Sequence, residues 1–153
     1  MIKIREQITT YKNAVDNWIH KNNKSQNEIE FWTNVWNDLL KYNQFLCDFG
    51  SCRVYIIDGA YIRNNVCLDF CVGANFCRYP WMPENTLGVE RILPSGMDRN
   101  AIIIHEYSEI KAMMEGMSYD DAHSKIANKE EDTYRQNPKN SKYYDELVKA
   151  GLE

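Results

Sequence analysis

The fold of the C-terminal half is decided by the stretch Ile102-Ile103-Ile104-His105-Glu106-Tyr107-Ser108-Glu109, in which three apolar residues lead directly into His-Glu-x-x-Glu. We predict one helix over residues 98–115, with Gly116 as its C-terminal stop. Ser118 is a candidate N-cap for a second helix that ends before the next proline. Residues 98–136 are therefore predicted to form a helical hairpin.

The N-terminal part is predicted to contain another helical hairpin and then strands. Apolar residues recur at helical spacing on both sides of a polar break, which predicts a helical hairpin over residues 1–48. Residues 53–93 carry β-rich runs and turn dipeptides such as Asp58-Gly59, which favour a small antiparallel β-meander. The expected strands are residues 53–57, 60–63, 66–72, 75–79 and 87–93. Helices, meander and helices together predict an α+β fold in a single domain, residues 1–153.

Composition and charge exclude several classes of function. The chain has 153 residues, of which 44% are hydrophobic and 12% aromatic, as in a folded globular protein. Its net charge of -4 offers no basic field for a nucleic acid, so we expect no nucleic-acid partner. No apolar run approaches the roughly 20 residues of a membrane span, and residues 1–6 do not resemble a signal peptide. We therefore expect a cytoplasmic protein, or one of the host cytoplasm or the virion if it is viral.

Four side chains of the predicted C-terminal hairpin have the spacing of a metal site. His105 and Glu109 lie four residues apart and share a helix face, and His123 and Glu130 lie seven apart on the next helix and share another. At about 1.5 Å per residue, all four fall within a band of about 10 Å along an antiparallel pair. Two imidazoles with one or two carboxylates suit zinc or non-haem iron. We predict His105, Glu109 and His123 as ligands of a zinc ion, with Glu130 as a possible fourth.

Glu106 would then have a chemical role. It follows His105 by about 100° around the helix, where a zincin places the carboxylate that deprotonates a metal-bound water. This arrangement predicts hydrolysis of an amide-type bond, with Glu106 as general base. A metal-free alternative stays open, because His123 bridging to Glu109 across the hairpin needs no ion. In that case the acidic residues are ordinary helix residues.

A resemblance supports the metal interpretation. The patterns His105-Glu106-x-x-Glu109 and Gly116-x-Ser118-Tyr119-x-x-Ala122-His123 resemble a group of small uncharacterised phage and bacterial proteins. Those proteins carry an HExxE helix followed by a G-x-S/T-Y-x-x-A-H helix and look like distant zincin-type metalloproteins. The likeness covers roughly residues 54–131 and implies a fold and a metal, but no activity. Glu109 stands where the zincin motif has its second histidine.

A second function from another class rests on an aromatic loop. Trp81 and Tyr79 lie beside prolines and are candidates to rim a pocket or to contact a protein or peptide partner. The alternative for Trp81, and the more common outcome for such a residue, is packing within its own loop. The alternative function is thus a non-catalytic phage or mobile-element protein that acts by binding a protein partner. The other tryptophans lie on apolar helix faces and are expected in the core: Trp18, Trp32 and Trp36.

Overall fold

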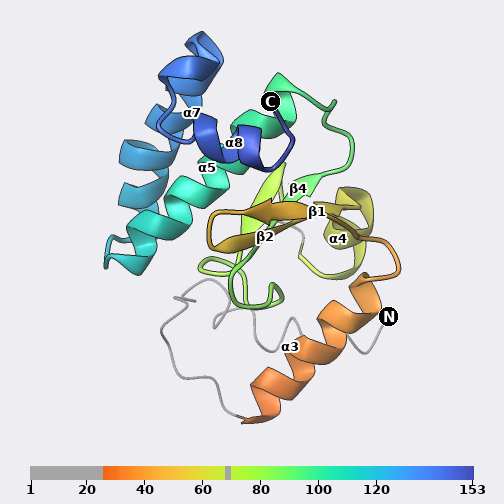
Figure 1. Cartoon of the computed structure of the whole chain (residues 1–153). Helices are drawn as coiled ribbons and strands as arrows, with labels where there is room; N and C mark the ends of the chain where they lie inside the picture. The colour runs from red at the N-terminus through yellow and green to blue at the C-terminus, as the bar shows by residue number, and fades with distance from the viewer. Residues whose placement is uncertain (1–25, 68–69) are drawn as a thin grey trace.

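The computed structural model describes residues 26–67 and 70–153, and its fold is α+β, as predicted (Figure 1). The elements, in chain order, are α3 (Gln26–Leu39), β1 (Gln44–Phe49), β2 (Cys52–Ile57), α4 (Gly59–Asn65), β3 (Gly73–Asn75), β4 (Thr86–Glu90), α5 (Met97–Met114), α6 (Tyr119–Asp121), a π-helical turn (Ala122–Ala127), α7 (Asn128–Gln136), a 3-10 turn (Pro138–Asn140) and α8 (Tyr144–Lys149). The helix predicted before residue 26, which includes Trp18, lies outside the described residues.

The sheet is mixed, so the predicted antiparallel meander is wrong. Its four strands run in the order β1-β2-β4-β3. The outer pairs are antiparallel, but β2 and β4 are parallel, with Val54 opposite Leu87. A parallel pair needs a crossover connection, whereas a meander has only hairpins. Residues 58–85 supply this crossover, and they contain α4 and β3.

Helix α4 replaces the return strand predicted for residues 60–63. Asp58 is its N-cap, and the Asp58 Oδ1 atom accepts a hydrogen bond of 3.2 Å from the Tyr61 amide. Gly59 begins the helix and donates its N–H to Glu90 Oε1 of β4 at 2.9 Å. Asp-Gly is a hairpin signal and aspartate is also a good N-cap, so the local sequence is compatible with both. The contact with Glu90, 31 residues away, favours the helix.

Two further predicted boundaries are wrong. Residues 44–48, expected at the end of the N-terminal hairpin, belong to β1, because α3 ends at Leu39. Two strands were predicted at residues 66–72 and 75–79, but among the described residues of 66–79 the structure has one strand, β3 (Gly73–Asn75). The second helix of the hairpin predicted over residues 1–48 is confirmed as α3, and its Trp32 and Trp36 are buried as expected.

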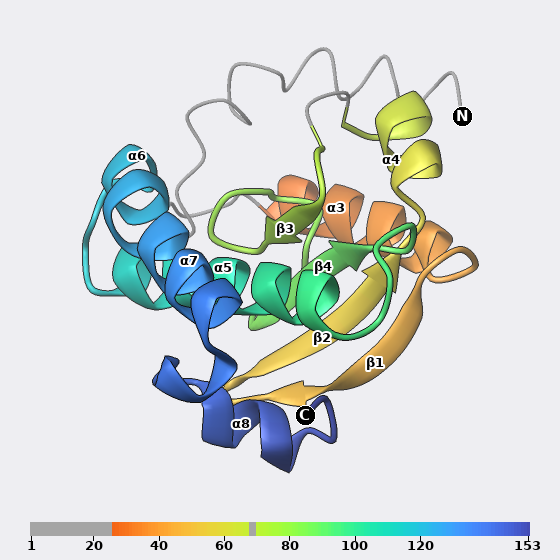
Figure 2. The same cartoon turned by 90° about the horizontal axis from the view of Figure 1, so that it is seen from above.

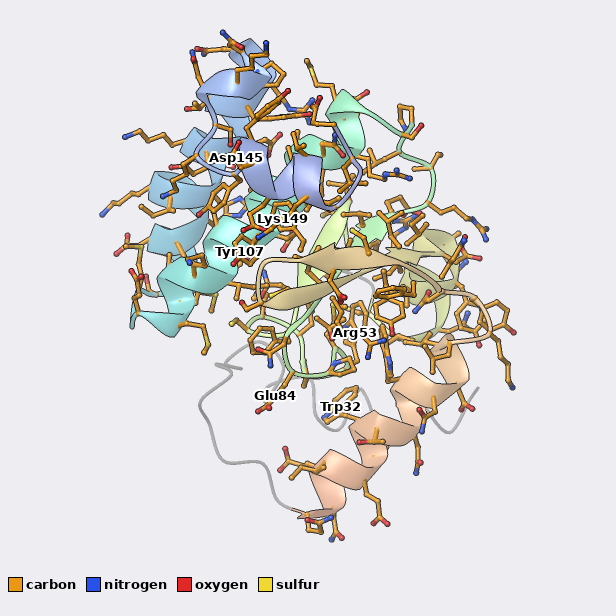
Figure 3. The ribbon with its side chains drawn as sticks, in the orientation of Figure 1. Trp32, Arg53, Glu84, Tyr107, Asp145 and Lys149 are labelled. Atoms are coloured by element: carbon orange, nitrogen blue, oxygen red, sulfur yellow. The ribbon has the colours of Figure 1, made fainter. Side chains whose placement is uncertain are left out.

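Helix α5 is the centre of the packing. It lies between the sheet on one side and the π-helical turn with α7 on the other (Figure 2). Its run Ile102-Ile103-Ile104 is buried. Tyr107, which is labelled in Figure 3, packs edge-on against Phe49 of β1 and against Tyr143 before α8. On the other side of the sheet, Trp36 of α3 meets Tyr55 of β2 at 5.1 Å. A helix buried on nearly every face offers rigid support for the side chains that it carries.

Within residues 26–67 and 70–153, no helix combines the length and apolar character that crossing a bilayer requires.

Candidate metal centre

The predicted C-terminal hairpin is present, and its two helix faces meet. Helix α5 carries His105, Glu106 and Glu109, and after the turn at Gly116 the chain returns through α6 and the π-helical turn, which carries His123. His105 and Glu109 are nearly buried, with side chains 9% and 3% exposed, whereas His123 is 42% exposed. The site is thus anchored on the core side and open on the other.

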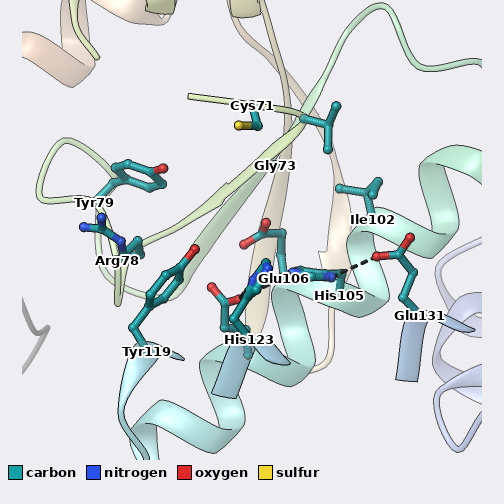
Figure 4. A pocket seen from close by; sticks show the side chains of 12 residues that line it. Cys71, Gly73, Arg78, Tyr79, Ile102, His105, Glu106, Tyr119, His123 and Glu131 are labelled. Carbon is teal, nitrogen blue, oxygen red and sulfur yellow. Dashed lines mark hydrogen bonds and ion pairs between the residues drawn. The ribbon is translucent and has the colours of Figure 1, made fainter. Parts of the chain in front are cut away.

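Three candidate ligand atoms form a small triangle (Figure 4). His105 Nε2 lies 3.1 Å from His123 Nδ1 and 3.4 Å from Glu109 Oε2, and His123 Nδ1 lies 3.0 Å from Glu109 Oε2. Around a tetrahedral zinc with bonds near 2.1 Å, neighbouring ligand atoms are separated by about 3.4 Å. The triangle therefore has the size of one face of a zinc coordination tetrahedron. Atoms this close repel one another unless a cation, a proton or a metal ion, lies among them.

The second nitrogen of His105 is fixed by Glu131. His105 Nδ1 lies 2.9 Å from Glu131 Oε1, and Arg135 Nε donates to Glu131 Oε2 at 2.9 Å. The hydrogen bond from His105 lowers the pKa of Glu131, against the effect of burial, and Arg135 lowers it further. An ionised carboxylate only accepts hydrogen bonds, so the His105 proton is placed on Nδ1. In the neutral ring this leaves the lone pair of Nε2 facing the triangle, as in the carboxylate–histidine–zinc arrangement.

Glu131, and not the predicted Glu130, is the α7 carboxylate that contacts the cluster, and it does so as a hydrogen-bond partner of His105 rather than as a fourth ligand. Glu130 Oε1 instead lies 3.5 Å from Lys142 Nζ, and Glu130 is not among the residues grouped around the triangle. The cause is the π-helical turn, in which the Asn128 amide bonds to the His123 carbonyl five residues earlier. Such a turn uses one residue more than an α-helical turn, so the following residues rotate by about 100°. The residue that shares the face of His123 is then eight positions away rather than seven.

Asn75, at the end of β3, holds both carboxylates of α5. Its side chain is fully buried, and Nδ2 donates to Glu106 Oε2 at 2.7 Å and to Glu109 Oε1 at 2.9 Å. Its Oδ1 accepts the amides of Cys77 and Arg78 at 3.0 and 3.1 Å. Sequence reasoning missed this residue, since Asn75 stands 31 and 34 residues from its carboxylate partners and in no motif.

Glu106 combines burial with limited hydrogen bonding. Burial and the negative charge of Glu109 raise its pKa from 4.5 to about 8, although His105 and Asn75 act in the opposite direction. A Cβ added at Gly73 would collide with the Glu106 carboxylate, so the glycine gives that carboxylate its room. Glu106 lines the same cavity as the triangle. A carboxyl group with a pKa near neutrality can both accept and return a proton.

His105 has a strongly shifted pKa as well. Burial alone would lower it, but hydrogen bonds with Glu109 and Glu131 and the charge of Glu106 outweigh burial and raise the pKa from 6.5 to about 10. In the metal-free cluster the His105 ring therefore carries a second proton at neutral pH. A metal ion has to displace that proton, which makes metal affinity dependent on pH.

The cluster lies at the floor of a cavity of about 410 Å³ (Figure 4). The lining comprises these residues: Cys71, Val72, Gly73, Arg78, Tyr79, Ile102, His105, Glu106, Glu109, Tyr119, His123 and Glu131. Tyr79, predicted as a binding residue, is thus at the cavity wall. Trp81 does not line the cavity: it is 1% exposed and packs near Phe70 and Tyr79, which agrees with packing within its loop and not with a tryptophan at the rim of a pocket.

Comparison of the chain with protein-family models, with curated proteins and with solved structures gave no match. The interpretation of the site therefore rests on its own geometry.

Proposed function

We propose that this protein is a zincin-like metalloprotein that binds zinc through His105 Nε2, Glu109 Oε2 and His123 Nδ1 and hydrolyses an amide-type bond. The observation that carries the proposal is the triangle of these atoms, with sides of 3.0–3.4 Å, supported by Glu131 on the other nitrogen of His105. Three protein ligands and one open position are the usual set of a catalytic zinc site. The cavity above the triangle gives a substrate access to that position.

The residues present fit the chemistry of hydrolysis. A zinc ion acts as a Lewis acid and lowers the pKa of the water that it coordinates. Glu106 accepts a proton from the attacking water as the new bond to the carbonyl carbon forms. When the carbon–nitrogen bond breaks, Glu106 delivers that proton to the leaving amine, so the products are a carboxylic acid and an amine. Its position suits this double role, because Glu106 is buried beside Gly73 and lines the same cavity as the triangle of candidate ligands.

Metal analysis of untagged protein tests the proposal. After exposure to micromolar zinc and removal of free metal, we expect about one zinc per chain in the wild type, with iron measured in the same sample. His105→Ala and His123→Ala should each lose the metal. His123 is the safer of the two for folding, because its side chain is 42% exposed. Circular dichroism of each variant shows whether it is folded.

The third histidine provides the matched control. His20 stands in the sequence outside residues 105–123, which supply the candidate ligands, so we expect His20→Ala to keep the metal. A wild-type protein that takes up neither zinc nor iron would refute the proposal. It would leave the metal-free ion-pair interpretation of the same contacts.

The partner-binding alternative finds no specific support in the described residues. Its main candidate residue, Trp81, is buried, and Tyr79 faces the cavity of the candidate metal centre.

A further inference from the structure

One wall of the cavity carries an arginine stacked on tyrosines. The Arg78 guanidinium carbon lies 4.8 Å from the ring centre of Tyr119 and 5.3 Å from that of Tyr79. All three residues line the cavity together with the metal-ligand triangle, and Figure 4 shows them on the side away from Glu131. Stacking on aromatic rings restricts the plane of a guanidinium, so less rotational freedom is lost when it binds a ligand.

This wall is tied to the candidate ligands by a closed set of contacts. The Arg78 amide donates to Asn75 Oδ1, and Asn75 Nδ2 donates to Glu109. Glu109 contacts His123, whose ring stacks on Tyr119 at 5.5 Å, and Tyr119 in turn contacts Arg78. Arg78 is therefore held in a fixed relation to the zinc position by both its backbone and its side chain. Such preorganisation is typical of a group that orients a ligand.

The charges along the cavity favour an anionic ligand at Arg78. Glu131 is already paired with His105 and Arg135. Zinc would offset the charges of the two remaining carboxylates, Glu106 and Glu109. Arg78 is the arginine among the residues that line the cavity, and it lies on the same wall as Tyr79 and Tyr119. A planar guanidinium binds carboxylates and phosphates with two parallel hydrogen bonds. Of these two anions, the carboxylate is the one that an amino acid or peptide carries next to an amide bond.

The size of the cavity limits the ligand further. A volume of about 410 Å³ is at the lower end of the range for small-molecule sites. Val72 and Ile102 give part of the wall an apolar character. The space suits a small molecule or the end of a chain, with one charged group and a short apolar part.

We propose that Arg78 determines substrate specificity by binding a free carboxylate near the scissile amide, so that the substrate is an N-acyl amino acid or the C-terminal end of a peptide. This inference rests on the proposed function, since it takes the zinc position as the place of the scissile carbonyl. Tyr79 and Tyr119 support the guanidinium, and the contact through Asn75 keeps it in register with the ligands.

Paired hydroxamates test the inference on the zinc-loaded full-length protein. The monohydroxamates of dicarboxylic acids, from succinic to pimelic acid, are compared with alkyl hydroxamates of the same chain length. Both series bind zinc through the hydroxamate, but only the first offers a carboxylate. We expect one chain length at which the carboxylate improves affinity by about tenfold or more, the gain of a charge-assisted pair. In Arg78→Gln this preference should disappear, and Arg78→Lys should keep part of it because it keeps the charge.

Arg91→Gln is the control of equal charge change. Arg91 pairs with Asp58 at 3.1 Å beside α4 and does not line this cavity, so its variant should keep the preference. Equal affinity for both probe series in the zinc-loaded wild type would overturn this inference and leave the proposed function intact. Failure to bind zinc would overturn both. The two sources of the carboxylate, an N-acyl amino acid and the C-terminal end of a peptide, are then separated by hydrolysis rates. N-acetylphenylalanine represents the first, and a tripeptide with a free C-terminus represents the second, with the amidated tripeptide as its control.

Discussion

Two buried glutamates, Glu90 and Glu106, lie against glycines but have different surroundings. A Cβ at Gly59 would collide with the carboxylate of Glu90, and a Cβ at Gly73 with that of Glu106. In both places a missing side chain admits a carboxylate into the interior. What differs is how each charge is compensated.

Glu90 has strong donors of its own. It accepts the Gly59 amide at 2.9 Å and pairs with Arg63 at 3.0 Å. Glu106 shares one amide group, that of Asn75, with the second carboxylate Glu109. The first arrangement stabilises the crossover between β2 and β4. The second keeps a carboxyl group undercompensated beside a cavity, and this is the condition that shifts a pKa toward the range useful for proton transfer.

Neutralising each glutamate should separate the two roles, with the largest effect at the candidate base. Glu106→Gln should lower the rate of amide hydrolysis by about 10²- to 10⁴-fold, the usual contribution of a general base, while zinc binding persists. Glu90→Gln should leave turnover unchanged and lower the melting temperature, because its ion pair with Arg63 is lost. Turnover on a fluorogenic amide library and zinc content are measured for both. Equal turnover in Glu106→Gln and the wild type would contradict the assignment of the base.

Adding a methyl group at each glycine is the next sharpest comparison. Gly59→Ala should lower the free energy of unfolding by about 2–4 kcal/mol, because Glu90 must leave its buried partners. Gly73→Ala should displace Glu106 and reduce turnover, with a smaller loss of stability. Urea denaturation of the zinc-loaded proteins gives the first quantity and the amide assay the second. A larger loss of stability in Gly73→Ala than in Gly59→Ala would contradict the contrast between the surroundings of Glu106 and Glu90.

Removing the shared amide should weaken metal binding more moderately. Asn75→Ala leaves Glu106 and Glu109 without their common donor, so zinc affinity should fall by about 10- to 100-fold, as for other residues that orient ligands. Competition with a fluorescent chelator measures the change. Asn128→Ala, at an exposed position of α7, should keep the affinity of the wild type. An unchanged zinc affinity in Asn75→Ala would show that the hydrogen bond from Asn75 is not needed to orient Glu109.

The smallest effect concerns the stability of the metal-free protein as pH changes. The pKa of Glu106 is raised from 4.5 to about 8, so the folded state favours its protonated form. Its contribution to stability is therefore complete below about pH 4.5 and is lost as the pH rises through about 8. Glu106→Gln should remove this part of the decline, as measured by denaturation in EDTA across that range. Parallel curves for variant and wild type would mean that Glu106 ionises normally.

The predictable part of the molecule is the part whose information is local. The hairpin of residues 98–136 follows from periodicity and caps. The spacing of His105, Glu109 and His123 along it predicts that they lie close together, and the structure has them so. The sheet was harder, because Asp58 starts a helix as readily as a hairpin, and the deciding contact is with Glu90. Asn75 was out of reach for a similar reason, since only tertiary packing brings it to α5.

A different limit of prediction from sequence is shown by Glu131, which contacts His105 where Glu130 was expected to reach the cluster. Regular helical geometry gives the correct element and the correct residue type, but one wide turn shifts the register by one position. The local composition of residues 122–127 does not predict the π-helical turn. A prediction from spacing is therefore good to one residue where a helix departs from the α form.

The wide turn has a consequence for tracing this site through sequences. It acts as a one-residue insertion between His123 and Glu131, the carboxylate that contacts His105. In a chain whose helix is regular throughout, the equivalent carboxylate would follow its histidine by seven positions, whereas here Glu131 follows His123 by eight. Two proteins with the same arrangement in space would then align correctly only with a gap inside a helix, where gaps are least expected.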